Sequence, residues 1–117
     1  MLSTVYSATC IGIDAFPVEI EVDVANGLPQ VTIVGLPDQG VRESKERVKS
    51  ALRNSGFSLA PKKITVNLAP ANIKKEGPAF DLAIALGILA SSGFLKQEKL
   101  AKSLFLGELA LDGSLRE

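Results

Sequence analysis

The chain has 117 residues, of which 46% are hydrophobic and 22% charged, and its 13 basic residues balance its 13 acidic ones. This composition fits one globular domain and argues against both a disordered chain and a protein whose whole surface binds nucleic acid. Because the chain has no histidine and one cysteine, it excludes histidine-dependent catalytic triads, zinc sites built from His or several Cys, and an internal disulfide. No signal sequence or apolar run of membrane-spanning length is evident, so we expect a cytoplasmic protein without a membrane partner.

The first 35 residues predict three strands that pair in order as a meander. Residues 3–13 are rich in small and β-branched side chains and have a weak period of two. In residues 16–24 apolar side chains alternate with Pro, Glu and Asp, which is typical of an antiparallel strand with one solvated face. Asn26 and Gly27 favour a tight hairpin turn, and residues 30–35 predict the third strand.

Two helices are predicted in the rest of the chain. The first begins at Asp38, a good N-cap, and ends near Ser55. Two pairs four residues apart, Arg42 with Glu46 and Glu43 with Arg47, are expected on its solvated side. A strand over 63–68 and a loop then lead to a second helix that begins near Pro78. This helix is apolar nearly all round, so we expect it to be buried against the sheet.

The last part of the chain predicts a short helical turn over 96–102, a strand over 103–111 and a turn at Asp112 and Gly113. Taken together, these elements predict an α+β domain of two layers, with a mixed sheet and its helices on one side.

Two acidic features are candidate sites. Glu19, Glu21 and Asp23 share one strand face and could collect a divalent cation, but the alternation of a solvated strand already explains them. Asp81 is the one charge in the apolar helix. It falls in the first turn, where the helix dipole favours an anion, and we expect a structural role because no catalytic partner is evident.

Basic residues on loops are the candidate contacts for phosphate groups. Lys62 and Lys63 form one pair, and Lys74 and Lys75 form a second that we single out as a nucleic-acid contact. The competing interpretation is that these are solvated loop lysines, since no aromatic side chains lie among them for base stacking. No G-x-x-x-x-G-K-[ST] or G-x-G-x-x-G sequence is present, so we predict no nucleotide, cofactor or metal site in this chain.

Two stretches of the sequence resemble known proteins. Residues 72–86 (NIKKEGPAFDLAIAL) and 107–113 (GELALDG) resemble the Lon-protease-like domain. Residues 18–57 are similar to the N-terminal domain of the YifB/ComM family of Mg-chelatase-like AAA+ ATPases, and the resemblance extends over almost the whole chain.

This resemblance implies that residues 1–117 form a single Lon-like N-terminal domain, a fragment of a longer ATPase. ATP and Mg would bind a motor domain outside this chain. The longer protein would assemble as a hexameric ring and act on DNA, promoting branch migration during natural transformation. The domain itself would serve assembly and handling of the substrate.

The same resemblance implies that the chain is not an enzyme by itself. The nucleophile of Lon proteases is the serine of a Gly-Pro-Ser sequence, and here Gly77 and Pro78 are followed by Ala79. The position of the partner lysine lies beyond Gly113, outside the chain. Alanine cannot form an acyl-enzyme.

Four alternatives remain open at this point. The segment from Ala79 is also similar to the non-proteolytic Lon-like domain of RadA-type recombination ATPases. The other three are a Lon-like peptidase, a nucleic-acid-binding module that acts alone, and a phosphate-binding domain like that of small-molecule kinases.

Overall fold

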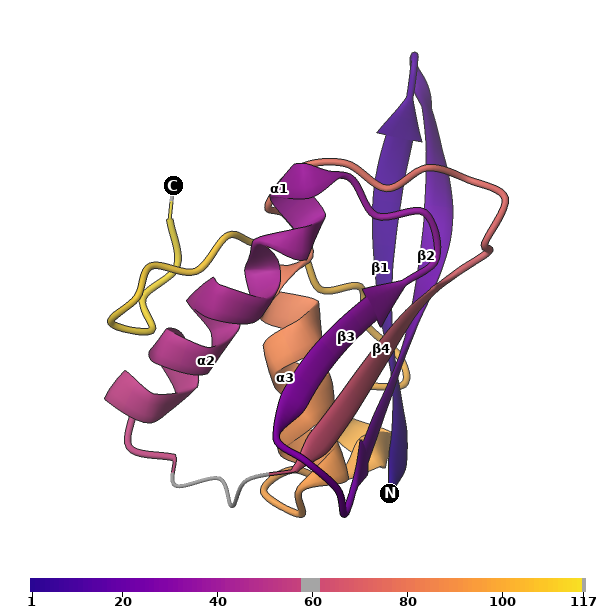
Figure 1. Cartoon of the computed structure of the whole chain (residues 1–117). Helices are drawn as coiled ribbons and strands as arrows, with labels where there is room; N and C mark the ends of the chain where they lie inside the picture. Colours follow the sequence, from indigo (N-terminus) through magenta and orange to yellow (C-terminus); the bar gives the residue numbers. More distant parts are fainter. Residues whose placement is uncertain (58–61, 117) are drawn as a thin grey trace.

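The computed structural model describes residues 1–57 and 62–116, and its main feature is a four-stranded mixed sheet with the helices on one side (Figure 1). The strands are β1 (Leu2–Ile11), β2 (Asp14–Ala25), β3 (Gln30–Val34) and β4 (Lys63–Ala69). The helices are α1 (Gln39–Arg42), α2 (Ser44–Asn54), α3 (Asp81–Ser91) and the 3-10 helix η1 (Gln97–Lys99). The predicted α+β class is therefore confirmed.

The strands lie in the order β1-β2-β4-β3, so the predicted meander of the first three strands is wrong. β1 and β2 pair antiparallel as expected, but β4 lies next to β2, and β3 pairs parallel to β4 at the sheet edge. The connection 26–29 leads past the start of β4, where Nζ of Lys62 donates a 2.6 Å hydrogen bond to the side chain of Asn26. The central place suits β4, because both of its edges are paired and Val66 and Leu68 are fully buried.

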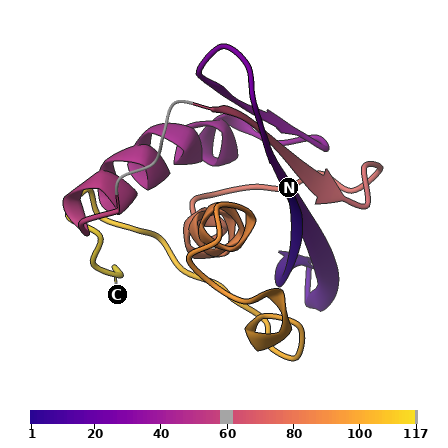
Figure 2. The ribbon, with the colours of Figure 1, turned by 90° about the horizontal axis from the view of Figure 1, so that it is seen from below.

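The core lies between the sheet and α3. Val18 and Ile20 of β2 have no exposed surface, whereas Glu19 between them faces solvent, which confirms the predicted alternation. The apolar helix α3 packs across β1 and β2, and Figure 2 shows it enclosed between the sheet and the other helices. Gly87 allows this close approach, because a Cβ atom there would lie 2.5 Å from Cγ2 of Val22.

The single helix predicted over 38–55 is divided at Glu43 into α1 and α2. Asp38 caps α1 as expected, and its carboxylate also accepts hydrogen bonds from the N–H of Gly77 in the loop before α3. α2 is instead tied through Arg47 to the first residue of α3. Arg47 also donates a 2.9 Å hydrogen bond to the carbonyl of Gly40 in α1, so it contacts both helices.

The tight hairpin predicted at Asn26 and Gly27 is wrong, because β3 does not pair with β2. The predicted short helical turn, the end of the first helix near Ser55 and the turn at Asp112 and Gly113 are confirmed. η1 lies within the short helical turn predicted over 96–102. Gly56 and Gly93 follow α2 and α3 with φ of 92° and 87°, the left-handed conformation in which helices commonly end. Gly113 has φ of 95° in the predicted turn, where Asp112 accepts a 2.9 Å hydrogen bond from the N–H of Ser114.

The strand predicted over 103–111 is wrong, because in the described structure this segment forms only isolated bridges. The N–H of Phe105 donates a 2.8 Å hydrogen bond to the carbonyl of Tyr6 in β1. Beyond that point the backbone turns to the start of α3, where the carbonyl of Gly107 accepts a 3.1 Å bond from the N–H of Leu82. Beyond its single bridge to β1, the segment therefore satisfies a donor that a helix N-terminus leaves free, instead of continuing along the sheet.

Candidate functional site

The candidate site lies around the N-terminus of α3, where residues 77–81 lead from a loop into the helix. Ala79 stands where the resemblance places a nucleophile, and its side chain is a half-buried methyl group. Its carbonyl accepts a 2.8 Å hydrogen bond from the N–H of Gly107, which holds this peptide against the C-terminal segment. A methyl group has no atom that can attack a carbonyl carbon, so this position supports no covalent catalysis.

Asp81, the first residue of α3, is fully buried and accepts four hydrogen bonds. Its Oδ1 accepts from Oγ of Ser44 at 2.5 Å and from Nη2 of Arg47 at 3.0 Å. Its Oδ2 accepts from Nε of Arg47 at 2.6 Å and from the N–H of Leu109 at 3.0 Å. The donors lie on α2 and on the C-terminal segment, so the carboxylate of Asp81 joins α3 to both.

The sequence did not reveal the pairing of Arg47 with Asp81. The 3.7 Å ion pair of Arg47 with Glu43 is present as predicted, but Arg47 is only 19% exposed and lies closer to Asp81. The hydrogen bonds to Asp81, more than any other interaction, raise the pKa of Arg47. No local pattern links these two residues, because they lie 34 positions apart; a lone acid in an apolar helix was the signal that a basic partner was needed.

Lys75 is not the surface residue that the sequence predicted. Its side chain is fully buried, and Nζ donates hydrogen bonds to the carbonyls of Gly35, at 2.8 Å, and of Pro70. These carbonyls directly follow β3 and β4, so the ammonium group joins the ends of the two parallel strands. Burial lowers the pKa of Lys75. The expected exposure of Lys75 is therefore wrong, because carbonyl oxygens inside the fold accept hydrogen bonds from its ammonium group.

Lys74 does face solvent, and Nζ lies 3.7 Å from a carboxylate oxygen of Glu76. It also lines a shallow cavity of about 320 Å³ beside the tip of the β1–β2 hairpin. Of the two lysines singled out from the sequence, Lys74 alone is placed where an external phosphate group could reach it.

The acidic row on β2, which consists of Glu19, Glu21 and Asp23, lies on the side of the sheet opposite α3, as the alternation predicts. Glu19 and Asp23 are exposed, and Glu21 accepts a 2.8 Å hydrogen bond from Nδ2 of Asn67 on β4. Within residues 1–57 and 62–116, no three His, Cys, Asp or Glu side chains are grouped closely enough to hold a metal ion. In the same part of the chain, no helix has the length and apolar character needed to span a membrane.

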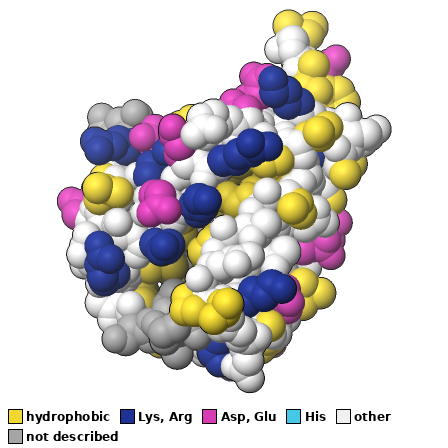
Figure 3. Space-filling model, in the orientation of Figure 1, with side chains coloured by type: hydrophobic (Ala, Val, Ile, Leu, Met, Phe, Trp, Pro, Cys, Tyr) yellow, Lys and Arg dark blue, Asp and Glu magenta, His cyan; other side chains and the backbone are white. Residues whose placement is uncertain are grey.

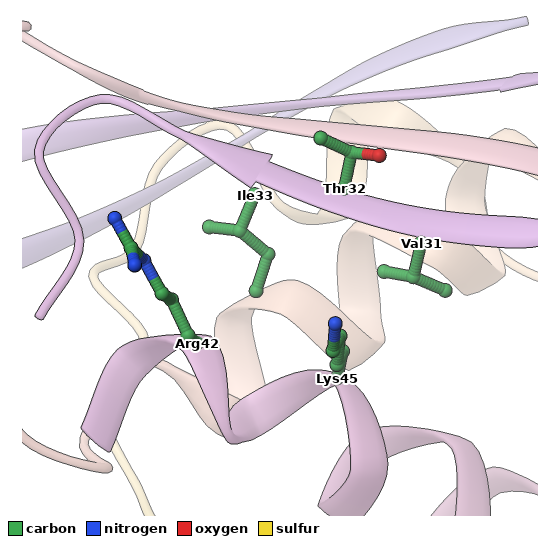
Figure 4. A pocket seen from close by; sticks show the side chains of 5 residues that line it. All are labelled: Val31, Thr32, Ile33, Arg42 and Lys45. Carbon is green, nitrogen blue, oxygen red and sulfur yellow. The ribbon is translucent and has the colours of Figure 1, made fainter. Parts of the chain in front are cut away.

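A second concave feature was not evident from the sequence. It is a cavity of about 210 Å³ between the edge strand β3 and the helices α1 and α2, called here the β3–α2 groove (Figure 4). Its lining residues are Val31, Thr32, Ile33, Arg42 and Lys45. Figure 3 shows that Lys and Arg side chains are prominent on the face of the molecule that carries α1 and α2.

Comparison with known proteins identifies close relatives over nearly the whole chain. The family model described as subunit ChlI of Mg-chelatase matches residues 20–117. The protein YifB of Escherichia coli is 48% identical over 115 residues, and the competence protein ComM of Haemophilus influenzae is 51% identical over 115 residues. Each alignment covers 98% of this chain but only 23% of the relative, so the chain spans about a quarter of the length of these proteins.

Proposed function

Because the chain belongs to the family of the ChlI subunit of Mg-chelatase, with YifB and ComM among its relatives, we propose that it is the non-catalytic N-terminal domain of a longer Mg-chelatase-like AAA+ ATPase. The family match favours the YifB/ComM family over the RadA-type recombination ATPases. The difference between 98% coverage of this chain and 23% coverage of the relatives supports a role as one part of a larger protein.

The nucleotide site of such an ATPase would lie in the rest of the longer protein. This chain has neither of the glycine-rich phosphate loops that bind nucleotides. The buried carboxylate of Asp81 is already bonded to Arg47, Ser44 and a backbone N–H, and does not fit a magnesium ligand. ATP and Mg²⁺ would therefore act in a motor domain outside this chain. The domain formed by residues 1–117 would serve assembly and substrate handling in a cytoplasmic ring.

The observation that supports a non-catalytic role is the methyl group of Ala79. The resemblance to Lon proteases assigns the nucleophile to this position, and the nearest lysine in sequence, Lys75, is bonded to two backbone carbonyls. The test is to incubate the purified chain with fluorogenic peptides and casein, and with a serine-directed acylating probe. We expect neither cleavage nor a mass increase; peptide cleavage with a covalent adduct would refute the proposal.

The role in assembly and substrate handling needs the longer protein. We expect that deletion of residues 1–117 shifts its mass in analytical ultracentrifugation from a hexamer towards smaller species, or lowers the rate of DNA branch migration. ATP hydrolysis by the motor gives the control, since it shows that the truncated protein is folded. If hexamers and branch migration were both unchanged, the domain would have no part in either.

Direct binding of nucleic acid by this chain is the second candidate function, and the exposed position of Lys74 favours it. We expect that labelled single-stranded and branched DNA bind more weakly as salt rises, because phosphate contacts release counterions. Lys74→Ala should weaken binding, and Lys99→Ala, which removes an exposed lysine on η1, serves as the matched control. Affinity that is insensitive to salt and to Lys74→Ala would exclude phosphate contacts there.

A further inference from the structure

The β3–α2 groove has an open strand edge as one wall. β3 is the last strand of the sheet, and its N-terminal residue Gln30 donates a backbone hydrogen bond to Lys62 and is in register with Lys63. In a parallel pair, alternate residues point their backbone groups to the same side, so the backbone groups of Gln30, Thr32 and Val34 face β4. The backbone N–H and C=O groups of Val31 and Ile33 therefore point outward. They form no backbone hydrogen bond with any residue that the structure describes.

The other wall of the groove is basic. Arg42 of α1 and Lys45 of α2 are exposed, and Figure 4 shows both side chains extending from the helices towards β3. Neither lies within 4.0 Å of a carboxylate among the residues described, so the predicted pair of Arg42 with Glu46 is wrong, whereas the neighbouring Glu43 is paired with Arg47. The side chains of Val31 and Ile33 point from β3 towards the helices and form the apolar part of the wall.

These two walls define what the groove can bind. An unpaired strand edge offers donors and acceptors that match the backbone of another extended chain. The two cationic side chains on the other wall, Arg42 and Lys45, favour a ligand that carries carboxylate groups. No aromatic side chain lines the groove, so it lacks the stacking surface that single-stranded nucleic acid uses.

We propose that the β3–α2 groove binds an acidic, extended segment of a partner protein, which adds to the sheet as a fifth strand beside β3. Side chains two positions apart in such a segment point to the same face and are separated by about 6.6 Å. Arg42 and Lys45 are separated by three positions, or about 4.5 Å of helix rise, and their long side chains cover the difference. Carboxylates at alternate positions of the partner therefore meet the two cations, and the apolar residue between them points away from the helices.

The acidic row of this chain has the right alternation but is not the occupant. Glu19, Glu21 and Asp23 belong to β2, which is paired with β1 on one side and β4 on the other. A central strand has no free edge to offer, so these three residues cannot supply the segment.

The test is a fluorescence anisotropy titration of the 117-residue chain with a short labelled peptide that alternates glutamate with valine. We expect saturable binding that weakens at least about tenfold with the pair Arg42→Glu and Lys45→Glu. The same double variant should gain affinity for a peptide that alternates lysine with valine. The matched control is the pair Lys49→Glu and Arg53→Glu, which makes the same change of charge on exposed residues of α2 outside the groove and should leave the affinity unchanged.

A second pair of variants tests the strand edge. Val31→Pro removes one outward N–H without touching the bonds to β4, and edge strands tolerate proline at such positions. Val31→Ala also replaces the valine side chain but keeps the backbone N–H. Binding should therefore be weakened more by the proline variant than by the alanine variant. Circular dichroism and the urea midpoint confirm that each variant is folded.

Three results would overturn the proposal. The first is failure of the acidic peptide to bind the folded wild-type chain. The second is an equal loss of affinity in both charge-reversal pairs. The third is displacement of the peptide by duplex DNA, which would assign the groove to nucleic acid instead of an acidic peptide.

Discussion

Replacement of Arg47 by methionine tests the buried ion pair that joins the two main helices. Asp81 has no exposed surface and receives two of its four hydrogen bonds from the guanidinium group of Arg47. In Arg47→Met the methionine fills part of the space, but the buried carboxylate loses its cationic partner. The other two hydrogen bonds, from Ser44 and Leu109, remain.

The expected cost follows from the burial of the carboxylate. Removal of one partner from a buried ion pair costs about 3–5 kcal/mol, and the two remaining hydrogen bonds favour the lower end, about 3 kcal/mol. A domain of this size has a free energy of unfolding of roughly 6–17 kcal/mol, so the variant should still fold but with a large loss of stability. With a urea m value of about 1.5 kcal/mol per molar, the unfolding midpoint should fall by about 2 M.

The assay is urea unfolding followed by far-UV circular dichroism. Arg53→Met is the matched control, because Arg53 is an exposed arginine on the same helix, and its replacement should change stability by no more than about 0.5 kcal/mol. The double variant Arg47→Met with Asp81→Leu removes the unpaired charge, so it should be less destabilised than the sum of the single variants. A loss of under about 1 kcal/mol for Arg47→Met, or additivity in the double variant, would refute this account.

Three further predictions concern glycine packing, helix capping and a buried lysine. Gly87→Ala should destabilise the fold by about 1–3 kcal/mol, because its Cβ would overlap the side chain of Val22; a higher melting temperature would show that the core has room. Asp38→Ala should cost about 1–2 kcal/mol in urea unfolding and Asp38→Asn clearly less, since asparagine can still accept from the start of α1 and from Gly77; equal losses would argue against a capping role. The pKa of Lys75 is lowered by burial, so the folded chain releases its proton before the unfolded chain does, and stability from this residue should rise with pH up to its ordinary pKa of 10.5. Urea unfolding of wild type and Lys75→Met across this alkaline range checks the sign, and a difference that is constant with pH would contradict it.

Local features of the fold follow directly from the sequence. The alternation in residues 16–24 predicts which side chains of β2 are buried, because successive residues of a strand point to opposite faces. Asp38 predicts the start of α1, because a carboxylate there accepts from the free N–H groups of the first turn. The continuous apolar pattern predicts the burial of α3. Each of these rests on interactions within a few residues of the chain.

Features that depend on distant segments were decided by the tertiary structure. The third strand was predicted beside β2, but β4 competes for that place, and strand pairing between distant segments leaves no local signal. The burial of Lys75 likewise follows from carbonyl groups 40 and 5 positions away that converge on its ammonium group. Periodicity reports which face of an element is apolar, whereas the choice of neighbour is set by the competition of all segments for the same core and the same hydrogen bonds. The pairing of Arg47 with Asp81 and the open edge beside Arg42 and Lys45 both result from that competition.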